Sequence, residues 1–185
     1  MLKIELPVKA PSVWVRIANL RIKSLDNLAP IMRTRVDNYL ADAAKIKTVN
    51  GEKFDPIVFE TARVDELQQI YFEQKTTKAR TAIYGWHFYW LAIDVISKSK
   101  EWSVSEAWWE LNASIMRRHG IDPGHDWNSP DDPHGQFGTL KKSPSDLART
   151  LYFGTPHWQG MKTFAPDDPR HMRGLKRVWK AVGAA

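Results

Sequence analysis

A histidine and an acid within the most apolar stretch of the chain are the first residues suited to chemistry. His87 and Asp94 stand seven residues apart in GWHFYWLAIDV, residues 85–95, whose other members are apolar, aromatic or glycine. A run of this kind predicts a largely buried β-strand with a turn or loop leading into it. Because burying an unpaired charge is costly, Asp94 needs a cation, hydrogen-bond donors or a metal as its partner.

A second pair follows in DWNSPDDPHGQF, where Asp131 and His134 stand three residues apart. Two histidines and an acid on separate segments can form a three-ligand zinc site with an open fourth position, the arrangement of catalytic zinc. His87, Asp94 and His134 are therefore the candidate metal ligands. Asp131 is a candidate general base and general acid. Arg63, at the end of an expected strand, is a candidate for holding a substrate carboxylate or a developing oxyanion.

Each of these residues also has an ordinary structural explanation. His87 could be a hydrogen-bonded packing residue, and Asp94 could form a salt bridge with Arg63. Residues 131–134 could form turns beside the prolines. His125 lies in the same segment, and spacing alone does not choose between it and the downstream histidine as a ligand.

The remaining histidines are expected to have no part in a metal site. His119 falls in the last turn of an expected helix, where a histidine interacts favourably with the helix dipole. His157 and His171 lie in the C-terminal third without the acidic and aromatic context of the two pairs, so both are expected at the surface.

The composition narrows the function classes. The chain of 185 residues has no cysteine, which excludes disulfides, thiolate catalysis and cysteine metal sites, so any metal must be held by histidine and carboxylate. A net charge of +6 favours anionic partners, but the Lys and Arg residues are scattered and form no basic tail. The first twenty residues lack an apolar signal core, and no apolar run is long enough to span a membrane.

Periodicity and turn residues predict the secondary structure. We expect helices over residues 26–45, 65–73, 103–120, 143–151 and 170–182, and strands over 56–63, 84–96 and 137–140. Residues 1–25 alternate weakly and predict short strands or an extended arm. Ser103 and Glu106 fit a capping box, and Asn50-Gly51 marks a turn. Residues 121–138, rich in Pro, Gly and Asp, predict a long functional loop.

These residues resemble the D-alanyl-D-alanine metallopeptidase superfamily, which includes phage and bacterial L-alanyl-D-glutamate endopeptidases and D-Ala-D-Ala carboxypeptidases. Its members carry Ser-x-His-x-x-Gly-x-Ala-x-Asp, and this chain has GWHFYWLAID, ending at Asp94. They also carry a Trp, an acid and then Pro-His, which correspond here to Trp127 and residues 131–134. An upstream Arg with a Gln five residues later corresponds to Arg63 and Gln68.

The resemblance implies a small α+β domain, with flanking helices and an antiparallel sheet that carries zinc in its cleft. It implies that His87, Asp94 and His134 are the Zn²⁺ ligands, in agreement with the reading of the residues themselves. It also implies that Asp131 is the catalytic acid and base, and that Arg63 stabilises the substrate or the oxyanion.

Four positions depart from the family pattern, within a resemblance that extends over residues 57–184. Gly85 replaces a Ser, Trp90 a Gly, Gly135 a Phe and Val64 a Ser. None removes a ligand, so the departures bear on substrate preference more than on zinc binding. Trp90 is large where the family has a Gly, and Gly135 is small where the family has a Phe. These two differences suggest the hypothesis that one change in side-chain size compensates for the other beside the site.

We therefore expect residues 1–185 to form a single zinc peptidase domain, with an N-terminal arm and helix (1–55), a catalytic core (56–140) and C-terminal helices (141–185). The expected activity is hydrolysis of peptidoglycan stem peptides, first as an L-alanyl-D-glutamate endopeptidase. A D-alanyl-D-alanine carboxypeptidase and a non-catalytic module that binds cell wall or peptide are the alternatives.

The expected partner is the peptidoglycan stem peptide, with no nucleic acid, no integral membrane association and a monomeric chain. Without a signal peptide the protein is expected to be made in the cytoplasm. It would then act at the bacterial cell wall in the manner of a bacteriophage endolysin, released by a separate protein that permeabilises the membrane.

Overall fold

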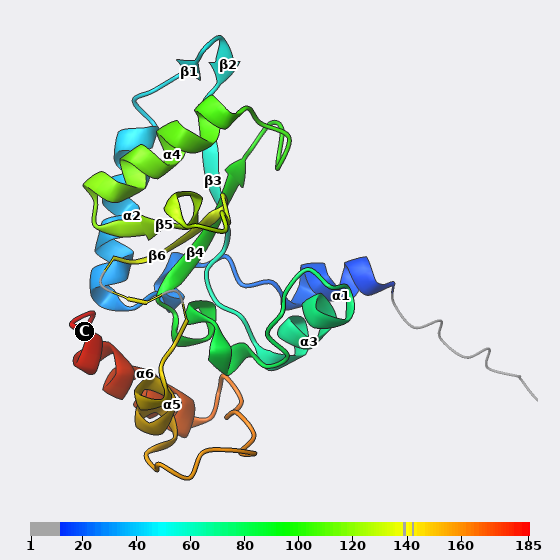
Figure 1. Ribbon diagram of the computed structural model, residues 1–185, viewed down its shortest axis with the longest axis vertical. Coiled ribbons are helices and arrows are strands. Elements are labelled where there is room, and N and C mark those ends of the chain that lie inside the picture. Colours follow the sequence, from blue (N-terminus) through cyan, green and yellow to red (C-terminus); the bar gives the residue numbers. More distant parts are fainter. Residues whose placement is uncertain (1–11, 139, 142) are drawn as a thin grey trace, which may run out of the picture.

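The computed structural model describes residues 12–138, 140–141 and 143–185. Its main sheet has four antiparallel strands, in the order β3 (Pro56–Glu60), β4 (Ala92–Ser97), β6 (His134–Phe137) and β5 (Ile121–Pro123). A separate hairpin pairs β1 (Thr48–Val49) with β2 (Glu52–Lys53) around the predicted turn. With the helices that flank the sheet (Figure 1), this confirms the α+β class with a small antiparallel sheet.

The helices form three groups around the sheet (Figure 1). They are α1 (Val13–Leu20), α2 (Pro30–Ala43), α3 (Asp65–Glu73), α4 (Glu106–Arg118), α5 (Asp146–Phe153) and α6 (Pro169–Val182). The first group is α2 with α4, the second is α1 with α3, and the third is α5 with α6. None of the helices in the described part of the chain has the length and apolar character of a membrane span.

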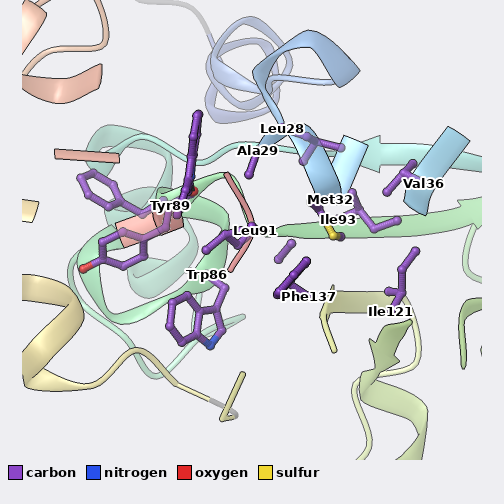
Figure 2. Packing of buried hydrophobic residues seen from close by; sticks show 14 of the residues in the cluster. Leu28, Ala29, Met32, Val36, Trp86, Tyr89, Leu91, Ile93, Ile121 and Phe137 are labelled. Carbon is purple, nitrogen blue, oxygen red and sulfur yellow. Dashed lines mark hydrogen bonds between the residues drawn. The ribbon is translucent and has the colours of Figure 1, made fainter. Parts of the chain in front are cut away.

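One part of the core lies between the sheet and the pair α2 and α4, and the same buried cluster continues to α5 and α6. Figure 2 shows Met32 and Val36 of α2 next to Ile93 of β4, with Ile121 and Phe137 in the same buried cluster. Because successive side chains of a strand point to opposite faces, the residues that follow and precede these core positions point away from the core. This alternation leaves the second face of the sheet for a polar site.

A short 3-10 turn, η3 (Trp86–Tyr89), leads into β4 and carries one of the candidate ligands. The expected strand over residues 84–96 therefore exists only from Ala92 onward. The Trp179 indole of α6 donates to the Tyr89 carbonyl at 2.7 Å, and the Ala29 amide donates to the Trp90 carbonyl at 3.0 Å. The turn is thus held from two sides of the molecule.

Trp90 ends this turn with φ 60° and ψ 34°, the left-handed conformation. A bulky side chain adopts it rarely, whereas glycine adopts it readily, which explains the glycine of the resembled motif. The Trp90 ring lies 5.6 Å from the His171 ring and 6.1 Å from the Trp179 ring. A Cβ on Gly135 would instead meet Met116 Sδ at 2.9 Å, across the sheet. The hypothesis of a paired size exchange is therefore wrong.

The N-terminal segment differs from expectation. Residues 1–11 lie outside the described part, and Val13–Leu20 forms a helix instead of strands or an arm. Ser12 caps it by accepting a hydrogen bond from the Val15 amide at 3.4 Å. Ile17 packs with Leu67 and Ile70 of α3, and this tertiary contact outweighs the weak alternation of the sequence.

Several element boundaries also shift. α4 begins at Glu106 with Ser105 as its cap, so the predicted capping box at Ser103 is wrong. The predicted strand over 137–140 is observed three residues earlier as β6, and β5 lies within the segment expected to be a loop. The helices predicted over 65–73 and 170–182 are confirmed within one residue.

Candidate metal centre

The strand register brings the site together. Glu60, Asp94 and His134 face one another across β3, β4 and β6, because Asp94 is the partner of both of the others. The register shifts between Val58 and Glu60, as in a β-bulge, and such irregularities commonly redirect a side chain beside a functional site. His87 reaches the same place from η3.

Three ligand atoms converge there. His87 Nε2 lies 3.1 Å and His134 Nδ1 lies 3.4 Å from Asp94 Oδ1, and one ligand atom from each residue lies within 4.8 Å of the others. For metal–ligand bonds near 2.1 Å, neighbouring ligands of a tetrahedral zinc lie about 3.4 Å apart. The donor set and spacing therefore fit a zinc ion with three protein ligands.

The surroundings of the Asp94 carboxylate support the same conclusion. Two ring nitrogens face one carboxylate oxygen, which is favourable only if a proton or a metal lies between them. Asp94 is largely buried, and burial opposes its ionisation, yet His87 and His134 hold its pKa well below the usual range. Asp94 is thus a carboxylate anion that could bind a cation between itself and the two histidines.

Gln136 sets the tautomer of His134. Its amide oxygen lies 3.3 Å from His134 Nε2, while its amide nitrogen donates to the Lys141 carbonyl at 3.1 Å. Since the amide oxygen can only accept, His134 carries its proton on Nε2 and turns the Nδ1 lone pair toward Asp94. Partners of this kind orient metal ligands and tune their affinity.

Arg63 organises the outer side of Asp94. Its guanidinium donates to Asp94 Oδ2 at 3.2 Å, so that Oδ1 is the oxygen that could bind a metal, and it also contacts Glu60 and Gln68 Oε1. Burial would lower the pKa of Arg63, but Glu60 and Asp94 outweigh it and raise that pKa. The arginine is therefore a fixed cation beside the site, and the Tyr71 hydroxyl holds the other Glu60 oxygen at 3.1 Å.

Asp131 lies at the solvent-exposed edge of the site. Its amide donates to the Gly124 carbonyl at 3.0 Å, and its carbonyl accepts from the His134 amide at 2.9 Å. A Cβ on Gly124 would lie 2.4 Å from that Asp131 carbonyl oxygen, so only glycine permits this approach. The protein atoms packed around the carboxyl raise the pKa of Asp131, and the charge of Asp94 adds to the effect.

No protein-family model and none of the curated proteins matches this chain. Similar solved structures include the Serratia marcescens L-Ala D-Glu endopeptidase ChiX, which aligns with a TM-score of 0.47 at 18% identity, over 65% of this chain and 92% of that one.

The three predicted ligands therefore form one group, and the other histidines lie elsewhere. His125, the alternative ligand, lies among Glu106, Glu110 and Asp132. His119 Nε2 lies 2.9 Å from an Asp42 oxygen.

His157 is exposed, as predicted, but His171 is buried and the prediction of a surface position is wrong. Its Nδ1 lies 2.8 Å from the Tyr152 hydroxyl, and burial lowers its pKa. A buried histidine on the apolar face of α6 is stabilised by this one polar partner, which lies nineteen residues away and leaves no local signal.

Two residues of the site carry no motif in the sequence. Glu60 becomes a site residue because the strand register places it opposite Asp94, whereas Gln136 lies two residues after His134 on the same strand. Two signals were available: an acid within an otherwise apolar strand, and a polar residue two positions after a candidate ligand.

Replacing Gln136 with leucine is expected to weaken zinc affinity about 10- to 100-fold, the usual effect of losing such a partner. The leucine keeps the buried volume but leaves the His134 tautomer unfixed. Competition against a chromophoric chelator measures the affinity, with Gln159→Leu on the surface as the control. Equal affinity in a folded Gln136→Leu variant would show that Gln136 does not orient the ligand.

Proposed function

We propose that the protein is a zinc-dependent peptidase that hydrolyses the stem peptide of peptidoglycan. The observation that carries this proposal is the convergence of His87, Asp94 and His134 on one point, with Asp131 beside it. Three histidine and carboxylate ligands leave a fourth position open, as in catalytic zinc sites. The resemblance of the motifs to D-alanyl-D-alanine metallopeptidases supports the choice of substrate.

Bound at these residues, zinc would supply Lewis-acid polarisation of the scissile carbonyl and a lowered pKa for water. Asp131 takes the proton of the attacking water and delivers it to the leaving amine. The raised pKa of Asp131 suits both steps, because a carboxylate of higher pKa accepts a proton more readily and its pKa lies closer to the operating pH. Arg63 holds Asp94 in place and offers its remaining N–H groups to negative charge on the substrate or the intermediate.

The bond we propose first is that between L-alanine and D-glutamate, and the second is the terminal D-Ala-D-Ala bond of a carboxypeptidase. The two activities leave different products. Cleavage after L-alanine detaches the whole remaining stem peptide from the glycan strand, whereas a carboxypeptidase releases only free D-alanine. Mass spectrometry of the soluble fragments distinguishes them.

A non-catalytic module that binds wall or peptide is the competing function. A binding module has no need of a carboxylate with a raised pKa beside a possible metal group, which favours catalysis. The net charge of +6 would assist either function at an anionic wall.

The test is a digestion of purified peptidoglycan by the dialysed, zinc-loaded protein. We expect soluble peptide fragments that disappear with a chelator and return when zinc is added. Binding to the wall without any fragment, in protein that retains zinc, would replace the proposal with the binding module. Digestion that is indifferent to chelator would overturn the role of the metal.

A further inference from the structure

His125 has a carboxylate at each of its ring nitrogens. Its Nδ1 lies 2.9 Å from Asp132 Oδ1, and its Nε2 lies 3.1 Å from Glu110 Oε2 and 3.6 Å from Glu106 Oε1. Ionised carboxylates can only accept hydrogen bonds, so both ring nitrogens must carry protons to satisfy these contacts. The geometry is that of an imidazolium with partners on both sides.

The partners of His125 belong to two different parts of the molecule. Glu106 and Glu110 lie one turn apart on α4, whereas Asp132 directly follows Asp131 in the chain. His125 itself stands in the 3-10 turn η4 (Gly124–Asp126), which opens the segment that ends at His134. The protonated ring therefore joins the segment carrying Asp131 to a helix of the core.

A second ion pair supports the same junction. Arg117 of α4 contacts Glu110 at 2.6 Å and Asp126 at 2.5 Å. The arginine keeps its charge at every accessible pH, because Asp126 and Glu110 raise its pKa further. Of the two cations in these ion pairs, His125 is the one whose charge can change within the physiological pH range.

We propose that protonated His125 is a positioning residue, which holds the Asp131 segment against α4 in the geometry needed for proton transfer and releases it when the imidazole loses its proton. The proposal rests on the peptidase function given above, since it assigns to Asp131 the proton transfer that His125 serves.

The direction of the pH effect follows from the surroundings. Burial would lower the pKa of His125, but Asp132 and the two glutamates outweigh it and raise that pKa. A group whose pKa is raised on folding stabilises the folded state fully below its unfolded value, and this contribution is lost as the pH rises through the folded value. The hold on Asp131 is therefore complete below the usual pKa of histidine and is lost as the pH rises through the raised pKa of His125.

The charge of His125 defines the alkaline side of the pH profile. His125 must be protonated to hold the segment, so activity falls as the pH rises through the raised pKa of its imidazole. The alkaline limb of kcat is the part that depends on His125.

The experiment compares His125→Gln and His125→Lys with the zinc-loaded wild type over the pH range. Glutamine removes the charge, and we expect kcat to fall about tenfold near neutral pH with KM little changed, as for a slightly displaced catalytic group. Lysine keeps its charge to about pH 10, so kcat is expected to recover and to lose the alkaline limb. A limb that persists unchanged in His125→Lys would overturn the proposal.

His119→Gln is the matched control. This histidine also pairs with an acid at 2.9 Å and lies directly after α4, but its partner is Asp42 of α2 and not the Asp131 segment. Its replacement is expected to leave the shape of the pH profile unchanged. A matching loss of the alkaline limb in this control would assign the effect to helix stability.

A measurement without substrate separates this proposal from the peptidase function. We expect the His125 ring to titrate above the usual histidine range by NMR, and the protection of the Asp131 amide, measured relative to its intrinsic exchange rate at each pH, to fall over the same pH range. If both results were obtained in a protein without peptidase activity, protonated His125 would still hold the Asp131 segment against α4, and only the catalytic role of that segment would be rejected. A normal or lowered His125 pKa, or exchange independent of His125, would overturn the hold itself.

Discussion

Replacing His134 with alanine is expected to abolish zinc binding and to bring peptidase activity below detection. His134 supplies one of three ligand atoms, and its Nδ1 is oriented toward Asp94 by the Gln136 amide. The two ligands that remain are fewer than the three protein ligands that a catalytic zinc site requires. Elemental analysis should give about one zinc per chain in the wild type and close to none in the variant.

His157→Ala is the matched control, because His157 is exposed and lies outside the metal group. Ligand binding stabilises a folded protein by mass action, so zinc should raise Tm in the wild type and in this control but not in His134→Ala. Full zinc content in a folded His134→Ala variant would remove this residue from the ligand set. No zinc in any of the three proteins, after reconstitution, would leave the fold without the metal chemistry.

The group formed by His87, Asp94 and His134 could be predicted from the sequence because these residue types suit a metal site. A buried acid requires partners, and the sequence offers two histidines, one in the same apolar run and one in a later segment. The expected turn leading into the strand is observed, but it extends further than the sequence indicates: His87 lies in the 3-10 turn, Trp90 is left-handed, and the strand begins at Ala92. A run of apolar residues does not reveal where a chain reverses direction, since tertiary contacts to α6 hold that turn.

Long-range partners set the limit of prediction elsewhere. Strand register decides that Glu60 faces Asp94, and an ion pair with α4 decides where His125 lies. Neither contact leaves a local pattern, because the partners are separated by fifteen or more residues in sequence. The sequence does not indicate the N-terminal helix because the contact that stabilises it is also long-range: Ile17 is buried by α3 and not by its own neighbours.

Replacing Asp131 with asparagine is expected to lower kcat more than 100-fold while zinc content and folding are retained. Asparagine keeps the size of the side chain and its contacts with the Gly124 segment, but it cannot accept and return a proton. A positioned general acid and base contributes about 10²- to 10⁴-fold, which sets the expected loss. KM should change little, since no ligand or substrate-binding cation is removed.

The raised pKa of Asp131 gives this variant a second expected result. A carboxyl whose pKa is raised on folding destabilises the folded state once the pH exceeds its unfolded value. Asparagine removes that penalty, so Tm near neutral pH should equal or exceed that of the wild type while activity is lost. Opposite changes in activity and stability are typical of a catalytic residue held in an unfavourable environment.

The control is Asp167→Asn, which removes an exposed carboxylate far from the metal ligands in sequence and is expected to leave kcat and Tm unchanged. The decisive comparison is kcat against pH, because wild-type activity should fall at acid pH through the raised Asp131 value and the residual activity of Asp131→Asn should not. Near-normal kcat in folded, zinc-loaded Asp131→Asn would show that another group carries out the proton transfer. The fall of wild-type activity at acid pH would then also have to arise from a group other than Asp131.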